Sequence, residues 1–214
     1  MKIGVLGTGM VGQALAGKLA ALEHEVKMGA RQAGNEKAQA WAKNAGPRAS
    51  HGTFAEAAAF GDIVFHCALG SAALDVLEAA GAENLRGKPL VDVSNPLDFS
   101  QGMPPTLFTG KADSLGERIQ KAFREARVVK TLNTVNGNLM VNPGKLSAET
   151  DVFVCGNDAE AKKRVIALVR DFGWKSVIDL GDITAARATE AYLLLWLRLW
   201  GVLHTADFNI RLTR

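Results

Sequence analysis

The sequence is poor in cysteine, which limits the chemistry that it can support. Only two of its 214 residues are cysteines, Cys67 and Cys155. Two thiols are too few for a structural metal site, and both lie in apolar segments that are typical of buried strands. We therefore expect two buried free thiols, with neither a disulfide nor a metal site.

The sequence also lacks long apolar segments and runs of like charge. Its most apolar stretch, residues 192–204, is interrupted by Arg198 and is too short to cross a bilayer. The first apolar segment begins at Ile3, so no signal peptide is expected. The net charge is +3, and no basic run indicates nucleic-acid binding. We expect a cytoplasmic protein with neither a nucleic-acid nor a membrane partner.

Residues 1–12, MKIGVLGTGMVG, contain the motif around which the chain is organised. An apolar segment at 3–6 is followed at once by the glycine turn and then by an amphipathic helix. This is the dinucleotide-binding fingerprint GxGxxG in the strand–turn–helix context that it requires. Gly7 permits the turn, Gly9 lets a pyrophosphate approach the backbone, and Gly12 lets the helix pack closely on the strand. Since helix amides attract phosphates, the predicted contacts are Gly7, Thr8, Gly9, Met10, Val11 and Gly12.

Short apolar segments alternate with amphipathic ones along the rest of the chain, which predicts alternating strands and helices. Thr53 and Glu56 are spaced as a helix capping box. We expect an α/β fold of the Rossmann type, with a doubly wound, mainly parallel sheet, helices on both faces and a short C-terminal helical appendage. The predicted strands cover 3–6, 25–29, 48–50, 62–68, 89–93, 127–132, 151–155 and 174–179. The predicted helices cover 11–22, 35–45, 53–60, 71–80, 114–123, 158–172 and a last segment from 183.

The end of the second predicted strand lacks the carboxylate that usually binds the ribose of NAD. Ala30 and Arg31 stand there instead, and Lys37 follows soon after. A guanidinium suits a 2′-phosphate, so the sequence favours NADP(H) over NAD(H). Arg31 could instead stack on the adenine or lie in solvent, which would allow both cofactors. Residues 1–180 are thus predicted to form the NADP-binding domain, with 181–214 as a C-terminal helical segment packed on it.

Other candidate contacts follow later strands, because ligands of this fold bind at the carboxyl ends of the strands. Small or apolar residues there suit backbone contact with the cofactor, and amides suit its nicotinamide half. These candidates are Ala68, Leu69, Asn95, Pro96 and Asn133. Asn95 and Pro96 could also form an ordinary turn, and residues 133–138 could be a solvated loop. We expect His66 to be a satisfied core histidine, and the loop at 99–111 to lack regular structure and border the substrate.

The last predicted helix has almost no polar face in its middle, which is typical of a helix buried on all sides. In a chain of this size, that pattern suggests that a second subunit covers one side of the helix. The expected assembly is a homodimer. Arg187 and Glu190 lie one turn apart at the start of the helix, where they could form an ion pair or face the cofactor.

Read together, four motifs resemble a known family: the fingerprint, Ala30-Arg31, Ser94-Asn95-Pro96, and the helix start with Arg187 and Glu190. The chain is similar over its whole length to the small NADPH-dependent reductases grouped with coenzyme F-420:NADP oxidoreductase. The cytosolic domain of the six-transmembrane metalloreductases is a more distant relative.

The resemblance implies a Rossmann domain that binds NADP(H), often in a dimer. It places phosphate contacts on residues 8–11 and the 2′-phosphate contact on Arg31, with Ala30 where a Ser or Thr is common. It places nicotinamide contacts on Ala68, Leu69, Asn95 and Pro96. Residues 133–139 differ from the His-Thr-Ile type sequence of the deazaflavin enzymes, so the acceptor stays open.

The predicted activity is hydride transfer between NADPH and a flavin-like or deazaflavin (F-420) acceptor. No Lys, His or Tyr is evident as a general acid at a strand end, and a flat hydride acceptor needs none. One alternative is an NADPH-dependent imine or carbonyl reductase of the pyrroline-5-carboxylate reductase or 3-hydroxyacid dehydrogenase type. Another is a non-catalytic NADP(H)-binding sensor. The sequence identifies no catalytic residue.

Overall fold

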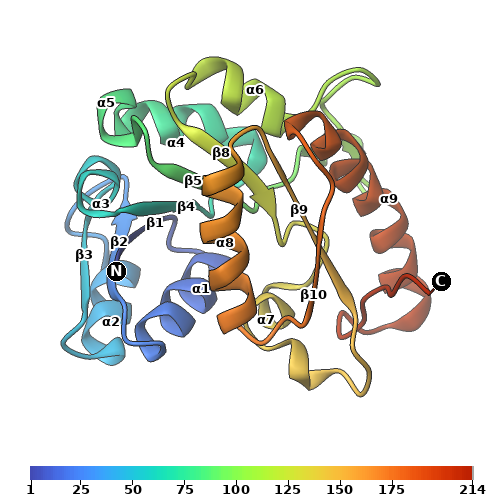
Figure 1. The fold of residues 1–214 in the computed structure, drawn as a ribbon, viewed down its shortest axis with the longest axis horizontal. Coiled ribbons are helices and arrows are strands. Elements are labelled where there is room, and N and C mark those ends of the chain that lie inside the picture. The colour runs from blue at the N-terminus through green and yellow to red at the C-terminus, as the bar shows by residue number, and fades with distance from the viewer. Residues whose placement is uncertain (214) are drawn as a thin grey trace.

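Eight strands form one sheet in the computed structural model, which describes residues 1–213 (Figure 1). The strands are β1 (Lys2–Leu6), β2 (Glu25–Ala30), β3 (Ala49–Thr53), β4 (Ile63–His66), β5 (Pro89–Asp92), β8 (Arg127–Thr131), β9 (Asp151–Gly156) and β10 (Ser176–Asp179). They lie in the order β10-β9-β8-β5-β4-β1-β2-β3. The order from β3 to β8 is that of a doubly wound Rossmann sheet, so the predicted fold class is confirmed.

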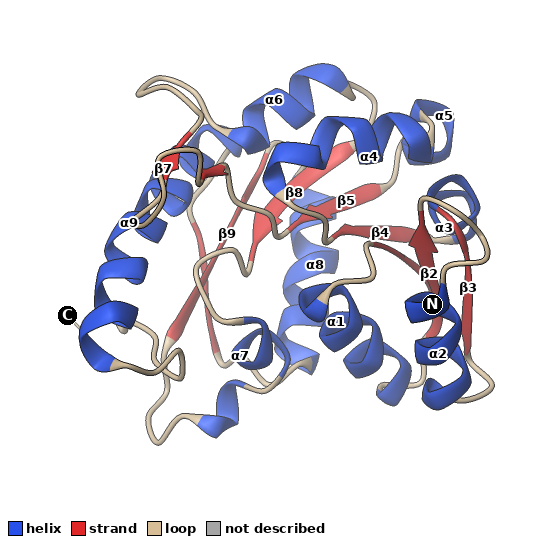
Figure 2. Ribbon diagram, turned by 180° about the vertical axis from the view of Figure 1, so that it is seen from behind, coloured by secondary structure: helices blue, strands red, loops and turns tan. Residues whose placement is uncertain are grey.

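Helices cover both faces of the sheet and create two apolar cores. They are α1 (Met10–Ala21), α2 (Glu36–Ala45), α3 (Phe54–Phe60), α4 (Ala73–Ala80), α5 (Ala82–Leu85), α6 (Leu115–Ala122), α7 (Gly137–Val141), α8 (Ala159–Asp171) and α9 (Ala186–Leu203). One core contains buried side chains of α1, α2, α7 and α8, and the other contains those of α3, α4, α5, α6 and α9. Figure 2 shows the two layers, with α4 and α6 above the sheet and α1 and α2 below it.

The central strands β1 and β4 are mostly apolar because both of their faces are covered. In β4, Val64 belongs to one core and Phe65 to the other, and both are fully buried. Burying one such side chain stabilises a fold by roughly 1.5–3 kcal/mol. Continuous apolar runs are therefore the expected signature of a central parallel strand.

Three local features differ from the sequence-based expectations. The strand expected at 62–68 is shorter, and α7 begins inside the predicted loop 133–138. The loop 99–111 is not free of regular structure, since β7 (Thr106–Leu107) pairs antiparallel with β6 (Leu97–Asp98). A backbone bond from Phe108 N to Pro96 O extends this small hairpin. Two-residue strands carry too little pattern to be recognised in a sequence.

The last helix is only partly buried in the single chain, so the expectation that a second subunit covers its other side stays a prediction. Only the first half of α9 packs against the core, and its buried residues end at Leu193. In the second half, Leu195 is 54% exposed and Val202 75% exposed. The following segment folds back, and Phe208 stacks on Trp196 with ring centroids 5.1 Å apart.

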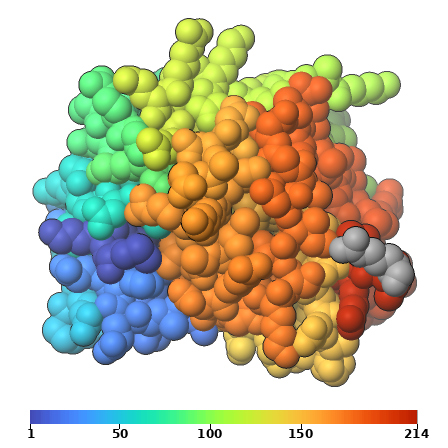
Figure 3. Space-filling view, viewed as in Figure 1, coloured from blue at the N-terminus to red at the C-terminus, as the bar shows by residue number. Residues whose placement is uncertain are grey.

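The end of the chain is held at the sheet edge, since Asp151 N of β9 donates to Ile210 O. In Figure 3 these C-terminal residues, in red, form the side of the molecule opposite the blue N-terminal segment. No helix within residues 1–213 is long and apolar enough to cross a membrane.

Candidate functional site

The glycine turn after β1 brings the strand and α1 unusually close together. Gly7 has a φ of +131°, and a Cβ on it would lie 2.9 Å from the carbonyl oxygen of Cys67. A Cβ on Gly12 would lie 2.2 Å from the carbonyl oxygen of Gly7. A larger residue at position 7 would therefore press the turn against the segment after β4, and one at position 12 would force α1 and the turn apart.

The amino end of α1 is open and uncapped. The N-cap residue is Gly9, the first turn has no acidic residue, and no side chain of the described residues caps the helix. No atom of residues 1–213 lies within 4 Å of a Cβ placed on Gly9, and Met10 is 90% exposed. A twelve-residue helix that ends in free amides and faces open space fits a pyrophosphate.

Two cations stand beside the carboxyl end of β2. Ala30, its last residue, points into the core and is 3% exposed, whereas Arg31 and Lys37 are exposed. The loop that carries Arg31 is fastened to β3, because His51 Nδ1 lies 3.1 Å from the carbonyl oxygen of Ala33. The sequence did not single out His51, since a contact between neighbouring strand ends leaves no local pattern.

The loops after β4 and β5 touch each other. A Cβ on Gly70 would lie 2.0 Å from the carbonyl oxygen of Asn95, so only glycine fits there. Next to it, Leu69 is 78% exposed, Ala68 is half-buried and Pro96 is buried. An exposed apolar side chain at the edge that binds ligands is a candidate for contact with a flat ring.

Asn95 and Asn133 form a reciprocal pair that joins the turns after β5 and β8. Asn95 Nδ2 donates to the backbone oxygen of Asn133 at 2.8 Å, and Asn133 Nδ2 donates to Asn95 Oδ1 at 2.9 Å. The structure thus brings these two predicted site residues into contact. Each amide still has one N–H to offer to a ligand.

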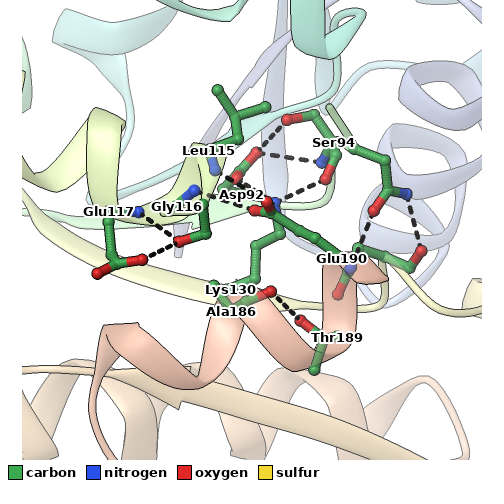
Figure 4. Close-up of polar contacts among 12 residues, drawn as sticks. Asp92, Ser94, Leu115, Gly116, Glu117, Lys130, Ala186, Thr189 and Glu190 are labelled. Atoms are coloured by element: carbon green, nitrogen blue, oxygen red, sulfur yellow. Dashed lines mark hydrogen bonds and ion pairs between the residues drawn. The ribbon is translucent and has the colours of Figure 1, made fainter. Parts of the chain in front are cut away.

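Three buried charges lie next to the turn that carries Asn95, since Lys130 Nζ donates to the backbone oxygen of Ser94 at 2.7 Å (Figure 4). Lys130 Nζ of β8 is 2.7 Å from Asp92 Oδ2 of β5 and 2.9 Å from Glu190 Oε1 of α9. Glu190 also accepts hydrogen bonds from the amides of Leu115 and Gly116, at 2.8 and 3.0 Å, in the first turn of α6. All three charged side chains are at most 1% exposed.

The neighbours of these groups set their protonation. Burial alone would raise the pKa of Asp92, but Lys130 and then His66 hold it well below its ordinary value. Burial alone would lower the pKa of Lys130, but Asp92 and Glu190 raise it above its ordinary value. Asp92 and Lys130 are therefore ionised across the neutral pH range.

The contacts of this cluster bear on two expectations, one for Arg187 and Glu190 and one for His66. Arg187 and Glu190 do not pair with each other, because Arg187 Nε donates to Glu117 Oε2 at 2.8 Å while Glu190 faces Lys130. His66 is fully buried as expected, with Nδ1 2.9 Å from Asp92 Oδ1, but its Nε2 has no partner among the described residues.

Our reading of the sequence missed this cluster. Its signal was present, since Asp92 and Lys130 are charged residues inside otherwise apolar strands. The partner Glu190 lies 60 residues further along the chain, and only the fold brings the three together.

Both cysteines are free thiols, but only Cys155 is buried as expected, while Cys67 is half-buried. Burial raises the pKa of Cys155 to about 12 and that of Cys67 far above its ordinary value. Both thiols are therefore protonated and unreactive near neutral pH. Residues 1–213 contain no group of side chains that could hold a metal ion.

The buried charges predict how stability depends on pH. The depressed pKa of Asp92 contributes stability above the ordinary value of 3.8, and this contribution is lost as the pH falls below it. The raised pKa of Lys130 contributes stability below 10.5, and this contribution is lost as the pH rises above it. The unfolding free energy should form a plateau between these values and fall on both sides. Urea denaturation across this range measures it.

Other carboxylates also protonate in acid, so a variant is needed to assign the acid limb. Asp92→Asn should be less stable on the plateau and lose less stability between pH 5 and pH 3 than the native chain, by roughly 1 kcal/mol or more. An unchanged acid limb in Asp92→Asn would contradict the assignment.

Comparison with known proteins agrees with this geometry. A family described as "NADP oxidoreductase coenzyme F420-dependent" matches residues 2–96, from β1 to the turn at Pro96. The F420-dependent NADP reductase of Methanocaldococcus jannaschii is 32% identical to the chain, over 100% of the chain and 98% of that protein. The metalloreductase STEAP3 of Rattus norvegicus is 30% identical over 94% of the chain, which spans only 38% of that longer protein.

A solved structure from Arthrobacter sp. FB24, described as a candidate F420-dependent NADP reductase, has the same fold. It is 50% identical, covers the whole of both chains and superimposes with a TM-score of 0.94. The resemblance drawn from the sequence is thus confirmed. Because a relative of matching length shares 32% of its residues, the chain belongs to the NADP oxidoreductase family named after coenzyme F420, and it is an NADP(H)-dependent oxidoreductase.

Proposed function

We propose that the protein transfers hydride between NADPH and a deazaflavin of the F-420 type or a related flavin. The observation that carries this proposal is the similarity over the full chain to the F420-dependent NADP reductase of M. jannaschii. The open amino end of α1 and the amide pair at the ends of β5 and β8 supply the two halves of a dinucleotide site. Residues 1–180 form the cofactor-binding part in this proposal, and 181–214 complete it.

The chain offers a distinct group to each part of NADPH. The turn from Gly7 to Gly12, with Thr8, Gly9, Met10 and Val11, receives the pyrophosphate. The exposed cations Arg31 and Lys37, next to Ala30, receive the 2′-phosphate. The nicotinamide half lies against the neighbouring loops, and its contacts are Ala68, Leu69, Asn95, Pro96 and Asn133.

The buried lysine and histidine favour a flat acceptor over a carbonyl. Bound NADPH supplies the hydride, and the chain has only to hold both rings in register. A carbonyl substrate would also need a proton donor for the developing alkoxide. Lys130 and His66, near the ends of β8 and β4, are fully buried and directed at Asp92, so neither faces the cofactor edge.

We also propose that the protein is a homodimer in which the second half of α9 is covered by a second copy. Several large apolar side chains stand exposed along this half of the helix. They are Leu194, Leu195, Trp200, Val202 and Leu203. A cluster of this kind is typical of an interface rather than of a free surface.

The first test replaces Arg31. Arg31→Ala should weaken NADPH binding by about 10- to 100-fold and leave NADH binding unchanged, because a charge-assisted bond to the 2′-phosphate is lost. Isothermal titration with both nucleotides measures this. Arg124→Ala removes an exposed arginine at the opposite sheet edge and should change neither. Equal affinity of the native chain for NADH and NADPH would refute the assignment.

The second test identifies the acceptor. Purified protein should oxidise NADPH when F-420, FMN or FAD is added, with loss of the nicotinamide absorbance band. Imine and carbonyl compounds should give no turnover. Turnover with these compounds alone would favour the imine or carbonyl reductase instead, and tight NADPH binding without any turnover would favour a sensor.

The third test concerns the assembly. Light scattering of the native chain should give twice the mass of one chain, and Leu195→Glu should shift it to a monomer, because a carboxylate cannot be buried unpaired in an apolar interface. Leu180→Glu alters a 38% exposed leucine at the far end of β10 and should leave the dimer intact. A native chain that is monomeric by light scattering would contradict the proposed homodimer.

A further inference from the structure

We propose that Lys130 is a positioning residue for the nicotinamide half of the cofactor site. Its buried ammonium group fixes the Ser94–Pro96 turn, and thereby the placement of Asn95. The inference rests on the proposed function in one respect, namely that Asn95 and its neighbours contact the nicotinamide. It adds a role for a side chain that lies behind the site and does not touch the ligand.

The Lys130 ammonium group has three partners. It donates hydrogen bonds to Asp92 Oδ2 and to the backbone oxygen of Ser94, each at 2.7 Å, and forms an ion pair with Glu190 Oε1 at 2.9 Å. Ser94 directly precedes Asn95, so the bond from Lys130 to Ser94 fixes the position of this turn relative to the sheet. A buried ammonium group without its partners is costly, so the three contacts hold each other in place.

Asp92 holds the same turn at two further points. Its Oδ1 accepts from the backbone amide of Ser94 at 3.1 Å and from the Ser94 hydroxyl at 2.7 Å. The amide, hydroxyl and carbonyl groups of Ser94 are thus all bonded to buried charges. A turn tied at three points to the interior cannot adjust without breaking charge-assisted bonds.

The turn that carries Asn133 follows β8, the strand that contains Lys130. Leu132, two residues on, has a φ of +60°, a conformation that leucine adopts at a cost of roughly 1–2 kcal/mol. This conformation turns the chain so that Asn133 meets Asn95 in the reciprocal pair. Such strain persists where the surroundings impose it, often at functional sites.

The C-terminal helix is part of the same arrangement. Glu190 joins α9 to Lys130 and to the first turn of α6. The strands β5 and β8 and the helices α6 and α9 are therefore linked through Lys130 and its two carboxylate partners (Figure 4). Lys130 therefore links the packing of α9 to the turn that carries Asn95. This explains why a charge is buried at a place where an apolar side chain would cost less.

The test separates positioning from a purely structural role by using two ligands. Adenosine 2′,5′-bisphosphate carries the 2′-phosphate end of NADPH but no nicotinamide. Lys130→Met should weaken NADPH binding by about tenfold and change binding of the bisphosphate by less than about twofold, since only the nicotinamide half loses its support. Isothermal titration measures both affinities, and circular dichroism and the melting temperature report whether the variant is folded.

A second variant keeps the test decisive if Lys130→Met does not fold, because that change leaves two buried carboxylates unpaired. Asp92→Asn leaves Lys130 and Glu190 as a balanced pair but removes the carboxylate that holds both the ammonium group and Ser94, which loosens the turn. The same selective loss of NADPH affinity is expected. Lys175→Met breaks an exposed ion pair with Glu149, at 2.7 Å, and is the matched control that should change neither affinity.

Proportional loss of both ligands, or no loss of either, in a folded Lys130→Met or Asp92→Asn variant would overturn the proposal. The assay contains no hydride acceptor. The selective loss of NADPH affinity can therefore be measured whether or not a hydride acceptor is identified.

Discussion

The turns after β5 and β8 depend on the buried contacts of the Lys130 ammonium group. This group contacts the carboxylates of Asp92 in β5 and Glu190 in α9 and donates to the backbone oxygen of Ser94, while Glu190 in turn accepts from backbone amides of α6. Loss of one partner from such a buried set typically costs 3–5 kcal/mol, which is a large share of the stability of an ordinary domain.

The polar groups at the carboxyl edge of the sheet differ in whether they have hydrogen-bond partners inside the protein. At the end of β1, the amides of α1 are left free and face open space, which is costly unless an anion satisfies them. Beneath the turns after β5 and β8, nearly every polar atom has a partner inside the protein. The first arrangement supplies binding energy, and the second supplies a fixed surface against which a ring can be oriented.

The absence of an accessible proton donor in this part of the site also has a physical basis. Lys130 and His66 are chemically able to donate protons, but both are directed at Asp92 in the interior. The chain belongs to a family of NADP oxidoreductases, and hydride transfer from a nicotinamide depends more on geometry than on acid catalysis. The contacts of Lys130 with Ser94 and of His66 with Asp92 connect these side chains to the backbone and to each other inside the protein.

The sequence by itself determined whatever depends on neighbouring residues. The glycine turn, the capping box of Thr53 and Glu56, the apolar strands and the doubly wound order all follow from local pattern and from the short connections of this fold. Only the tertiary structure decided the partners of Lys130, the pairing of Arg187 with Glu117 and the exposure of half of α9. The contacts join residues that are 36 to 70 positions apart, and a helical or strand period carries no information about which of them meet.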